Sequence, residues 1–209
     1  MALLLARQRF DVVDISLRDK SVALLALSPK GTVPVLHLPD GQVIDESWLI
    51  MAWAFAAGPQ RSLWQAAQSP VNLELVQRND GVFKQQLDRY KYPERYAAEG
   101  KRKEQSRDLA VTTLLGPLQD QLHTQAFLGG TTACATDLAI FPFVRQFAAV
   151  DPAWFAQLPM PALQAWLSHW LDSELFAMCM RRTAAPVGSA DAASTDANRS
   201  AGVGREMQR

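Results

Sequence analysis

Cysteine and histidine are scarce in this 209-residue chain, which has two cysteines, Cys134 and Cys179, and three histidines. Two cysteines can form neither a disulfide framework nor a cysteine metal cluster. The histidines His37, His123 and His169 are scattered along the chain without metal-ligand spacing. We therefore expect no metal site, and we expect each histidine to be structural or exposed.

The chain has no excess of charge of either sign, since Lys and Arg together number 21 and Asp and Glu together number 21. Without a basic excess, neither nucleic acid nor an anionic membrane is an expected partner. No apolar run approaches the length of a transmembrane helix. The apolar run Ala2–Ala6 is short and has no basic residue before it, so no secretory signal is predicted. We expect a cytoplasmic protein.

The composition, 48% hydrophobic and 20% charged, is that of a globular chain with enough apolar residues for a core. Residues 1–57 alternate short β-like and helical patterns, whereas residues 63–182 predict helix after helix. Residues 58–61 are typical of a linker between these two regions. Residues 183–209 contain no aromatic residue and are predicted to be a disordered tail, or alternatively a segment that folds on a partner. The fold class is therefore an α/β domain followed by an all-α domain.

The first region predicts the order helix, strand, helix, strand, strand, helix. These elements are expected at residues 1–9, 12–17, 21–27, 33–38, 42–44 and 45–55. A breaker cluster, Ser28–Gly31, ends the second helix, and Pro39–Gly41 makes a tight turn between the last two strands.

Two helices of the second region are predicted from their apolar spacing. The first runs from about Ala135 to Ala149 and is expected to kink at Pro142. Its inward residues are expected to be Leu138, Phe141, Val144 and Phe147. The second helix begins after Pro161, and its apolar stripe consists of Leu163, Trp166, Leu167, Trp170, Leu171 and Met178.

Val33-Pro34 opens a predicted strand, although proline cannot donate a hydrogen bond to a β-ladder. Two explanations are open. A cis peptide bond would turn the chain sharply and expose the backbone of Val33 for pairing with another peptide. Alternatively, the strand lies at the edge of its sheet and Pro34 is trans.

Glu46-Ser47 lies at the start of the next predicted helix. The free N–H groups and the dipole of a helix N-terminus form a site for a carboxylate, and a glutamate can accept from an ammonium group. Taken alone, Asp45 or Ser47 is better explained as a plain N-cap than as part of a binding site. Together with an exposed Val33 backbone, the arrangement fits a peptide whose free end carries both an ammonium and a carboxylate group, as the γ-glutamyl end of glutathione does.

Four segments resemble the soluble glutathione S-transferase superfamily: residues 28–36, 41–47, 127–130 and 135–142. The resemblance extends over about residues 1 to 180. It implies a thioredoxin-like, glutathione-binding domain at residues 1–57 and an all-helical domain at residues 63–182. It also implies glutathione as co-substrate and a homodimer.

The resemblance assigns roles to five residues. The Val33 backbone would pair with the cysteinyl part of glutathione, and Pro34 would be cis. Glu46 and Ser47 would hold the γ-glutamyl group. Lys30 would meet the glycyl carboxylate, unless it is an ordinary surface lysine.

The implied reaction is attack of the glutathione thiolate on a small electrophile, or thiol exchange with a disulfide substrate. Two alternatives stay open: a non-catalytic interaction module and a carrier of small molecules. The electrophile pocket of the superfamily lies between its domains. Aromatic side chains of residues 80–96 are candidates for it, although most of them are expected to belong to the core or to an interface.

Two features depart from the superfamily pattern. Its thioredoxin-like domain begins with a strand and a turn that carry the Tyr, Ser or Cys acting on the glutathione sulfur, whereas this chain begins inside the following helix. The catalytic residue is therefore unknown, and we expect the native chain to start upstream of Met1; a degenerate relative is the alternative. The second departure is Cys134, three residues before Asp137, where the superfamily has Ser or Thr. This cysteine is either a buried, inert cap or a reactive thiol at a helix N-terminus.

Overall fold

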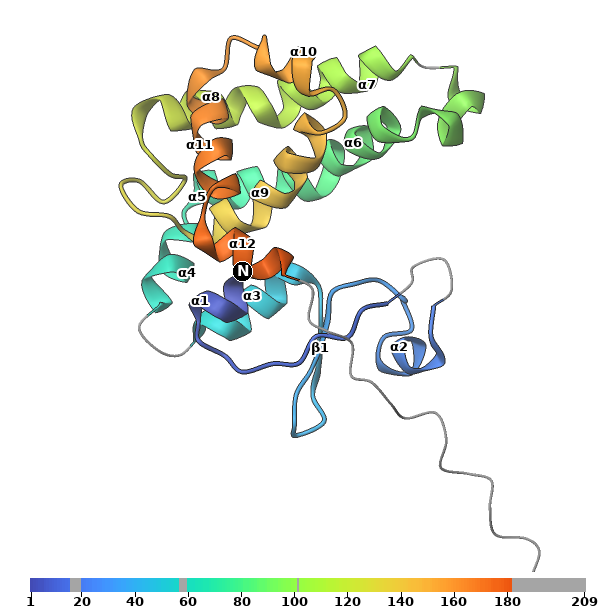
Figure 1. The fold of residues 1–209 in the computed structure, drawn as a ribbon, viewed down its shortest axis with the longest axis vertical. Helices are drawn as coiled ribbons and strands as arrows, with labels where there is room; N and C mark the ends of the chain where they lie inside the picture. Colours follow the sequence, from blue (N-terminus) through green and yellow to red (C-terminus); the bar gives the residue numbers. More distant parts are fainter. Residues whose placement is uncertain (16–19, 57–59, 101, 182–209) are drawn as a thin grey trace, which may run out of the picture.

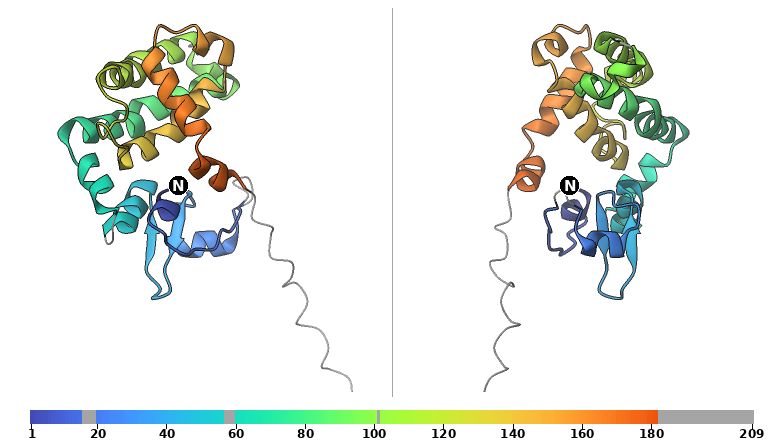
Figure 2. Two further views of the ribbon diagram at one scale, coloured as in Figure 1. Left: turned by 60° about the vertical axis from the view of Figure 1, so that its left-hand side comes forward. Right: turned by 90° about the vertical axis from the view of Figure 1, so that its right-hand side faces the viewer.

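The computed structural model describes residues 1–15, 20–56, 60–100 and 102–181. Figure 1 shows a bundle of helices, green to orange, next to a smaller part of the chain, coloured blue. The two views of Figure 2 agree that the β-hairpin of the smaller part projects away from the helical bundle. The molecule is therefore an α/β part followed by an all-helical part.

The smaller part contains three helices and one antiparallel pair of strands among its described residues. These elements are α1 (Ala2–Leu5), α2 (Val22–Leu27), β1 (Val35–His37), β2 (Val43–Asp45) and α3 (Ser47–Ala56). In the register of the two strands Val35 pairs with Asp45, Leu36 with Ile44 and His37 with Val43.

Short-range polar contacts explain where α2 and the hairpin begin and turn. The Ser21 hydroxyl accepts a hydrogen bond from the Leu24 amide at 3.2 Å, which caps the N-terminus of α2. At the tip of the hairpin, Asp40 Oδ1 accepts from the Gln42 amide at 2.9 Å. Gly41 has a φ of +90°, a conformation that glycine adopts without steric cost. These are the helix, turn and hairpin that the sequence predicts.

The N-terminal segment differs from the prediction in two ways. The helix expected over residues 1–9 ends at Leu5, because Arg7 adopts a left-handed conformation with φ +54°. The strand expected from residue 12 is wrong for residues 12–15, which have no regular structure, and Val13 is 78% exposed. A strand needs a neighbour for its backbone hydrogen bonds, and neither of the two described strands pairs with this segment. Residues 16–17 of the predicted strand lie outside the described residues.

The helical part begins at Arg61, two residues earlier than expected, and residues 57–59 of the predicted boundary lie outside the described residues. Its elements are α4 (Arg61–Ala67), α5 (Pro70–Arg78), the π-helical turn η1 (Asn79–Phe83), α6 (Lys84–Lys91), the 3₁₀ segment η2 (Pro93–Glu99), α7 (Lys103–Ala110), the π-helical turn η3 (Val111–Leu115), α8 (Gly116–Thr124), α9 (Ala135–Ala148), α10 (Pro152–Ala156), α11 (Pro161–Leu171) and α12 (Glu174–Met180). None of the described helices is long and apolar enough to cross a membrane.

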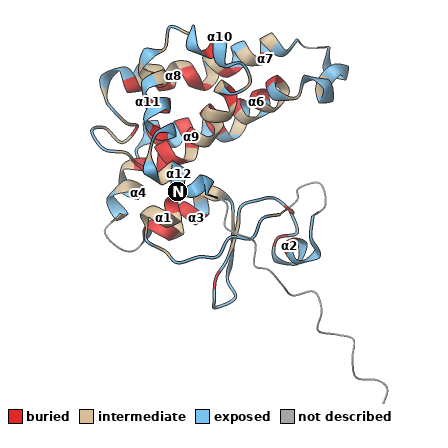
Figure 3. Ribbon diagram, in the orientation of Figure 1, coloured by how far each residue is buried: buried red, intermediate tan, exposed pale blue. Residues whose placement is uncertain are grey.

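The core is centred on α9, where the predicted inward face is confirmed. Its four expected inward residues, Leu138, Phe141, Val144 and Phe147, are all buried, and Pro142 lies inside the helix. Figure 3 shows that the buried residues concentrate in the helical part, whereas the hairpin and α2 are mostly exposed. The smaller part therefore has little core of its own.

The last predicted helix is broken into two helices. Four of its six stripe residues are buried as expected, but Leu171 and Met178 are exposed. The break has a local cause: the Ser173 hydroxyl accepts a hydrogen bond from the Phe176 amide at 3.1 Å and so caps a new helix, α12. The predicted tail, residues 183–209, lies outside the described residues.

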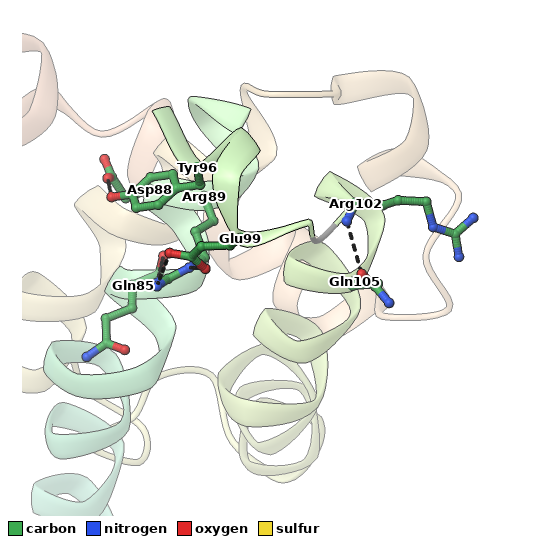
Figure 4. A network of polar contacts seen from close by, with 7 residues as sticks. All are labelled: Gln85, Asp88, Arg89, Tyr96, Glu99, Arg102 and Gln105. Atoms are coloured by element: carbon green, nitrogen blue, oxygen red, sulfur yellow. Dashed lines mark hydrogen bonds and ion pairs between the residues drawn. The ribbon is translucent and has the colours of Figure 1, made fainter. Parts of the chain in front are cut away.

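The turn that connects α6 to α7 is held by polar contacts, shown in Figure 4. Arg89 binds both carboxylate oxygens of Glu99, with Nε 2.9 Å from Oε2 and Nη2 3.0 Å from Oε1. The Tyr96 hydroxyl donates to Asp88. Since η2 has no buried residue, these contacts, and not a packed core, hold it against α6.

Candidate functional site

The β-hairpin brings together two segments that the sequence singles out. Because Val35 pairs with Asp45, the dipeptide Val33-Pro34 just before β1 lies beside Glu46-Ser47 just after β2. The peptide bond between Val33 and Pro34 is cis. Val33 is 47% exposed, so a ligand can reach this part of the chain.

The N-terminus of α3 offers free amides at this place. The first helical hydrogen bond runs from the Ile50 amide to the Glu46 carbonyl at 3.1 Å, so the amides of residues 47–49 have no partner within the helix. Asp45 is the last residue of β2 and Ser47 the first residue of α3. Glu46 therefore occupies the cap position, which corrects the interpretation of Asp45 or Ser47 as the N-cap. Its φ of +72° is uncommon for a residue other than glycine, and such residues cluster at functional sites.

Lys30 is joined to this helix start by two ion pairs. Its Nζ lies 3.0 Å from Asp45 Oδ2 and 3.3 Å from Glu46 Oε1. The hydrogen bond to Asp45, followed by the one to Glu46, raises the pKa of Lys30 above its usual value. All three side chains are partly or largely exposed, so solvent weakens both pairs. Lys30 thus lies in the site, with its ammonium directed at two carboxylates of the protein.

A second lysine, Lys20, lies against the loop that leads to Val33, and sequence reasoning missed it. A Cβ placed on Gly31 would be 3.0 Å from Lys20 Cδ and 3.1 Å from its Nζ. None of the acidic side chains in the described residues is ion-paired with Lys20. No spacing rule finds this residue, because α2 lies between it and Gly31 in the sequence and only the fold brings them together.

The segments 127–130 and 135–142, which also resemble the superfamily, form a buried polar cluster around Asp137 in the helical part. Its carboxylate accepts hydrogen bonds at 2.9 Å from the Leu128 amide, 2.8 Å from the Cys134 amide and 2.8 Å from Trp166 Nε1. Burial raises the pKa of the Asp137 carboxyl, and these hydrogen bonds act in the opposite direction. Through its bond to the Cys134 amide, Asp137 caps the start of α9, whereas its contact with Trp166 had no signal in the sequence.

Cys134 is buried beside this carboxylate. Burial, followed by the charge of Asp137, raises the pKa of its thiol to about 11. A protonated, inaccessible thiol is a poor nucleophile. Of the two interpretations of Cys134, the structure therefore supports the inert one.

The aromatic residues of segment 80–96 divide into two pairs. Phe83 and Tyr90 are buried in the core. Tyr92 and Tyr96 are half-buried and contact charged side chains of their own segment, as Figure 4 shows for Tyr96. The three histidines are exposed, and no group of side chains within the described residues could hold a metal ion.

Comparison with known proteins identifies the smaller part of the chain. Residues 1–56 match the family described as "Glutathione S-transferase, N-terminal domain". A comparison with curated proteins gives no significant match.

Solved structures extend this similarity to the helical part. The chain is 25% identical to a bacterial glutathione S-transferase, BphK, solved as a ternary complex, with a TM-score of 0.69 over 85% of this chain and 88% of that one. Glutathione transferase F7 from Populus trichocarpa is 17% identical, with a TM-score of 0.66 over 85% and 88%. Gtt2 from Saccharomyces cerevisiae is 22% identical, with a TM-score of 0.61 over 85% and 91%. The last two similarities show the fold, a thioredoxin-like part followed by a helical part.

Proposed function

The chain belongs to the soluble glutathione S-transferase superfamily, and from this premise we propose that it binds glutathione in the site formed by Lys30, Val33, Pro34, Glu46 and Ser47. The observation that carries the proposal is the position of Val33-Pro34 beside the free amides of α3, fixed by the register of the hairpin. Members of the superfamily use glutathione as co-substrate.

Each part of glutathione has a group of matching chemistry in this site. The exposed backbone of Val33 pairs with the cysteinyl residue, and Pro34 directs that backbone outward. The amides at the start of α3 and the Ser47 hydroxyl bind the γ-glutamyl carboxylate, while Glu46 accepts from its ammonium group. For the glycyl carboxylate, the contact of Lys20 with Gly31 favours Lys20, because Lys30 is already ion-paired with Asp45 and Glu46.

The proposed reaction is transfer of the glutathione thiolate to a small electrophile, or thiol exchange with a disulfide. A free thiol with a pKa near ~8.5 is only a few per cent ionised at pH 7, so such an enzyme must stabilise the thiolate. We assign no catalytic residue within the chain. We also propose that the protein is a cytoplasmic homodimer. Each chain has a glutathione-binding domain over residues 1–57 and a helical domain over residues 63–182, and the first helix of the helical domain, α4, begins at Arg61.

Isothermal titration of the 209-residue chain with glutathione tests the proposal. Ser47→Ala removes a hydrogen bond to the ligand's carboxylate, and Glu46→Gln removes the negative charge that faces the ligand's ammonium group. Each should weaken binding by about tenfold, since a hydrogen bond between charged partners, or to one, is worth about 1.5 kcal/mol more than its absence or its neutral equivalent. Ser62→Ala and Glu174→Gln, exposed residues at the starts of α4 and α12, are the matched controls and should bind like the wild type. Absence of glutathione binding, or equal binding by all four variants, would refute the proposed site.

One observation favours a second candidate function, a non-catalytic interaction module. Six apolar side chains between residues 10 and 27 are at least 37% exposed: Phe10, Val12, Val13, Val22, Leu25 and Leu27. A concentration of exposed apolar residues is typical of a surface that a partner covers. If the chain does not bind glutathione but forms a stable complex whose formation is lost on Val13→Asp and Val22→Asp, this second function is the correct one.

A further inference from the structure

The contact between Lys30 and Glu46 places an ammonium group of the protein on the carboxylate proposed to receive the ammonium group of the ligand. Nζ of Lys30 lies 3.3 Å from Glu46 Oε1. Among the described residues, Lys30 provides the only ion pair that Glu46 makes. The free protein thus contains, within its own chain, the charge that the γ-glutamyl end of glutathione would bring.

Asp45 keeps Lys30 in place when Glu46 is taken by a ligand. The Lys30–Asp45 contact is the shorter of the two, at 3.0 Å, and Asp45 is fixed by its pairing with Val35 in the hairpin. Its side chain is 28% exposed, against 59% for Glu46, so the contact with Asp45 is the less screened. An ammonium group has three donors, and losing one acceptor leaves Lys30 bound to the other.

We infer that Lys30 is a positioning residue and an internal competitor: it holds Glu46 in the free protein and yields it to a ligand that carries an α-ammonium group. The inference rests on the proposed binding of glutathione. It changes the role of Lys30 from a contact with the glycyl carboxylate to control of Glu46. A ligand without an ammonium group leaves the Lys30–Glu46 pair intact, so the competition affects only ligands that have one.

The inference predicts a change in ligand preference and not merely in affinity. The two ligands are glutathione and glutaryl-cysteinylglycine, which lacks only the α-amino group. In Lys30→Gln, glutathione no longer competes with a lysine for Glu46, so the ratio of Kd for the glutaryl peptide to Kd for glutathione should rise. Because exposed pairs are weak, the expected rise is about two- to fivefold at low salt and smaller at high salt.

Two further variants separate this effect from the loss of a positive charge. Lys20→Gln removes the same charge from the same part of the chain, and it should weaken both ligands equally, because both retain the glycyl carboxylate. Lys30→Arg keeps the charge and should restore the wild-type ratio. Unchanged thermal midpoints would show that each exposed substitution leaves the fold intact.

Each outcome decides the question. A ratio that rises in Lys30→Gln, and stays at the wild-type value in the other two variants, supports the inference. If Lys30→Gln weakens both ligands equally, as Lys20→Gln does, Lys30 binds a ligand carboxylate and the inference is wrong while glutathione binding stands. If the wild type binds neither ligand, the proposed function fails and this inference fails with it.

Discussion

Asp137 offers the sharpest test of what holds the helical part together. It accepts three hydrogen bonds from groups that have little other access to an acceptor: two backbone amides, of Leu128 and Cys134, and the indole of Trp166. The variant Asp137→Asn keeps the shape of the side chain but replaces one carboxylate oxygen by an NH₂ group. In one orientation of the amide, its NH₂ group faces the Cys134 amide; in the other, it faces both the Leu128 amide and the Trp166 indole.

The magnitude follows from counting these bonds. In the less costly orientation, with the amide oxygen at the Oδ1 position, Asp137→Asn removes one hydrogen bond to a charged acceptor, worth about 1.5–3 kcal/mol, and leaves one buried N–H unpaired, which costs about 1–3 kcal/mol. Relief from burying a charge offsets part of this loss, because burial alone raises the pKa of Asp137. We expect the free energy of unfolding to fall by about 3 kcal/mol. This is a large share of the unfolding free energy of a typical domain, which is about 5–15 kcal/mol.

Urea unfolding followed by tryptophan fluorescence and by circular dichroism measures this change. Asp120→Asn, an exposed aspartate on α8, is the matched control and should stay within about 0.5 kcal/mol of the wild type. Trp166→Phe removes one of the three donors, and its effect should not add to that of Asp137→Asn, since the two residues share a hydrogen bond. A loss below about 1 kcal/mol for Asp137→Asn, or strict additivity of the two substitutions, would refute the reasoning.

Three further predictions concern the thiols and the glycines. Titration with a thiol reagent at pH 8 should modify one thiol of the native protein, that of exposed Cys179, and a second one, Cys134, only after denaturation. The pKa of Cys134 is about 11 in the folded state against 9.0 for a free thiol, so the folded state keeps the proton that the unfolded state loses. The stability that this group contributes should be complete below about pH 9, and about 3 kcal/mol should be lost as the pH rises through 11. Cys134→Ser should lack this fall in urea unfolding. Gly129→Ala should destabilise the fold by more than about 2 kcal/mol in the same assay, because its Cβ would lie 2.5 Å from the Thr132 carbonyl oxygen. Gly116→Ala lies in a helix, where the nearest atom to its Cβ is 3.5 Å away, and it should stabilise the fold by up to about 1 kcal/mol. The reverse order of the two stabilities would contradict the packing argument.

The sequence predicted correctly those elements whose causes are local. The hairpin follows from a turn of Pro39–Gly41 between two short β-patterns, and α2 follows from its Ser21 cap and the breaker after it. The buried face of α9 follows from apolar spacing. In each case the residues that decide the structure lie within a few positions of the element, so the pattern alone was sufficient.

The failures have non-local or competing causes. Residues 12–15 have the composition of a strand, but a strand also needs a neighbour, and no local pattern reports whether one is there. The stripe that ends at Met178 has helical spacing throughout, yet Ser173 supplies a cap strong enough to start a new helix, in which Leu175 and Phe176 pack against the core and Met178 is exposed. Lys20 reaches Gly31 only through the fold of the intervening helix.

The candidate site likewise has a local feature, which the sequence predicted, and a non-local one, which it did not. The non-local feature is the connection that α3 makes between the site and the core. The spacing predicted that the segments 33–34 and 46–47 would meet, because the hairpin between them is local. What spacing could not show is that the far end of α3 is anchored: Met51 and Phe55 are buried in the core, and α3 contacts α4 and α9. A helix held at its C-terminal end presents the free amides at its N-terminus in a fixed direction, although Ser47 itself lies in a poorly buried part of the chain. The helical part therefore supports the candidate site without supplying any of its residues, and the exposed hairpin needs only to bring Val33 to a helix end that is already in place.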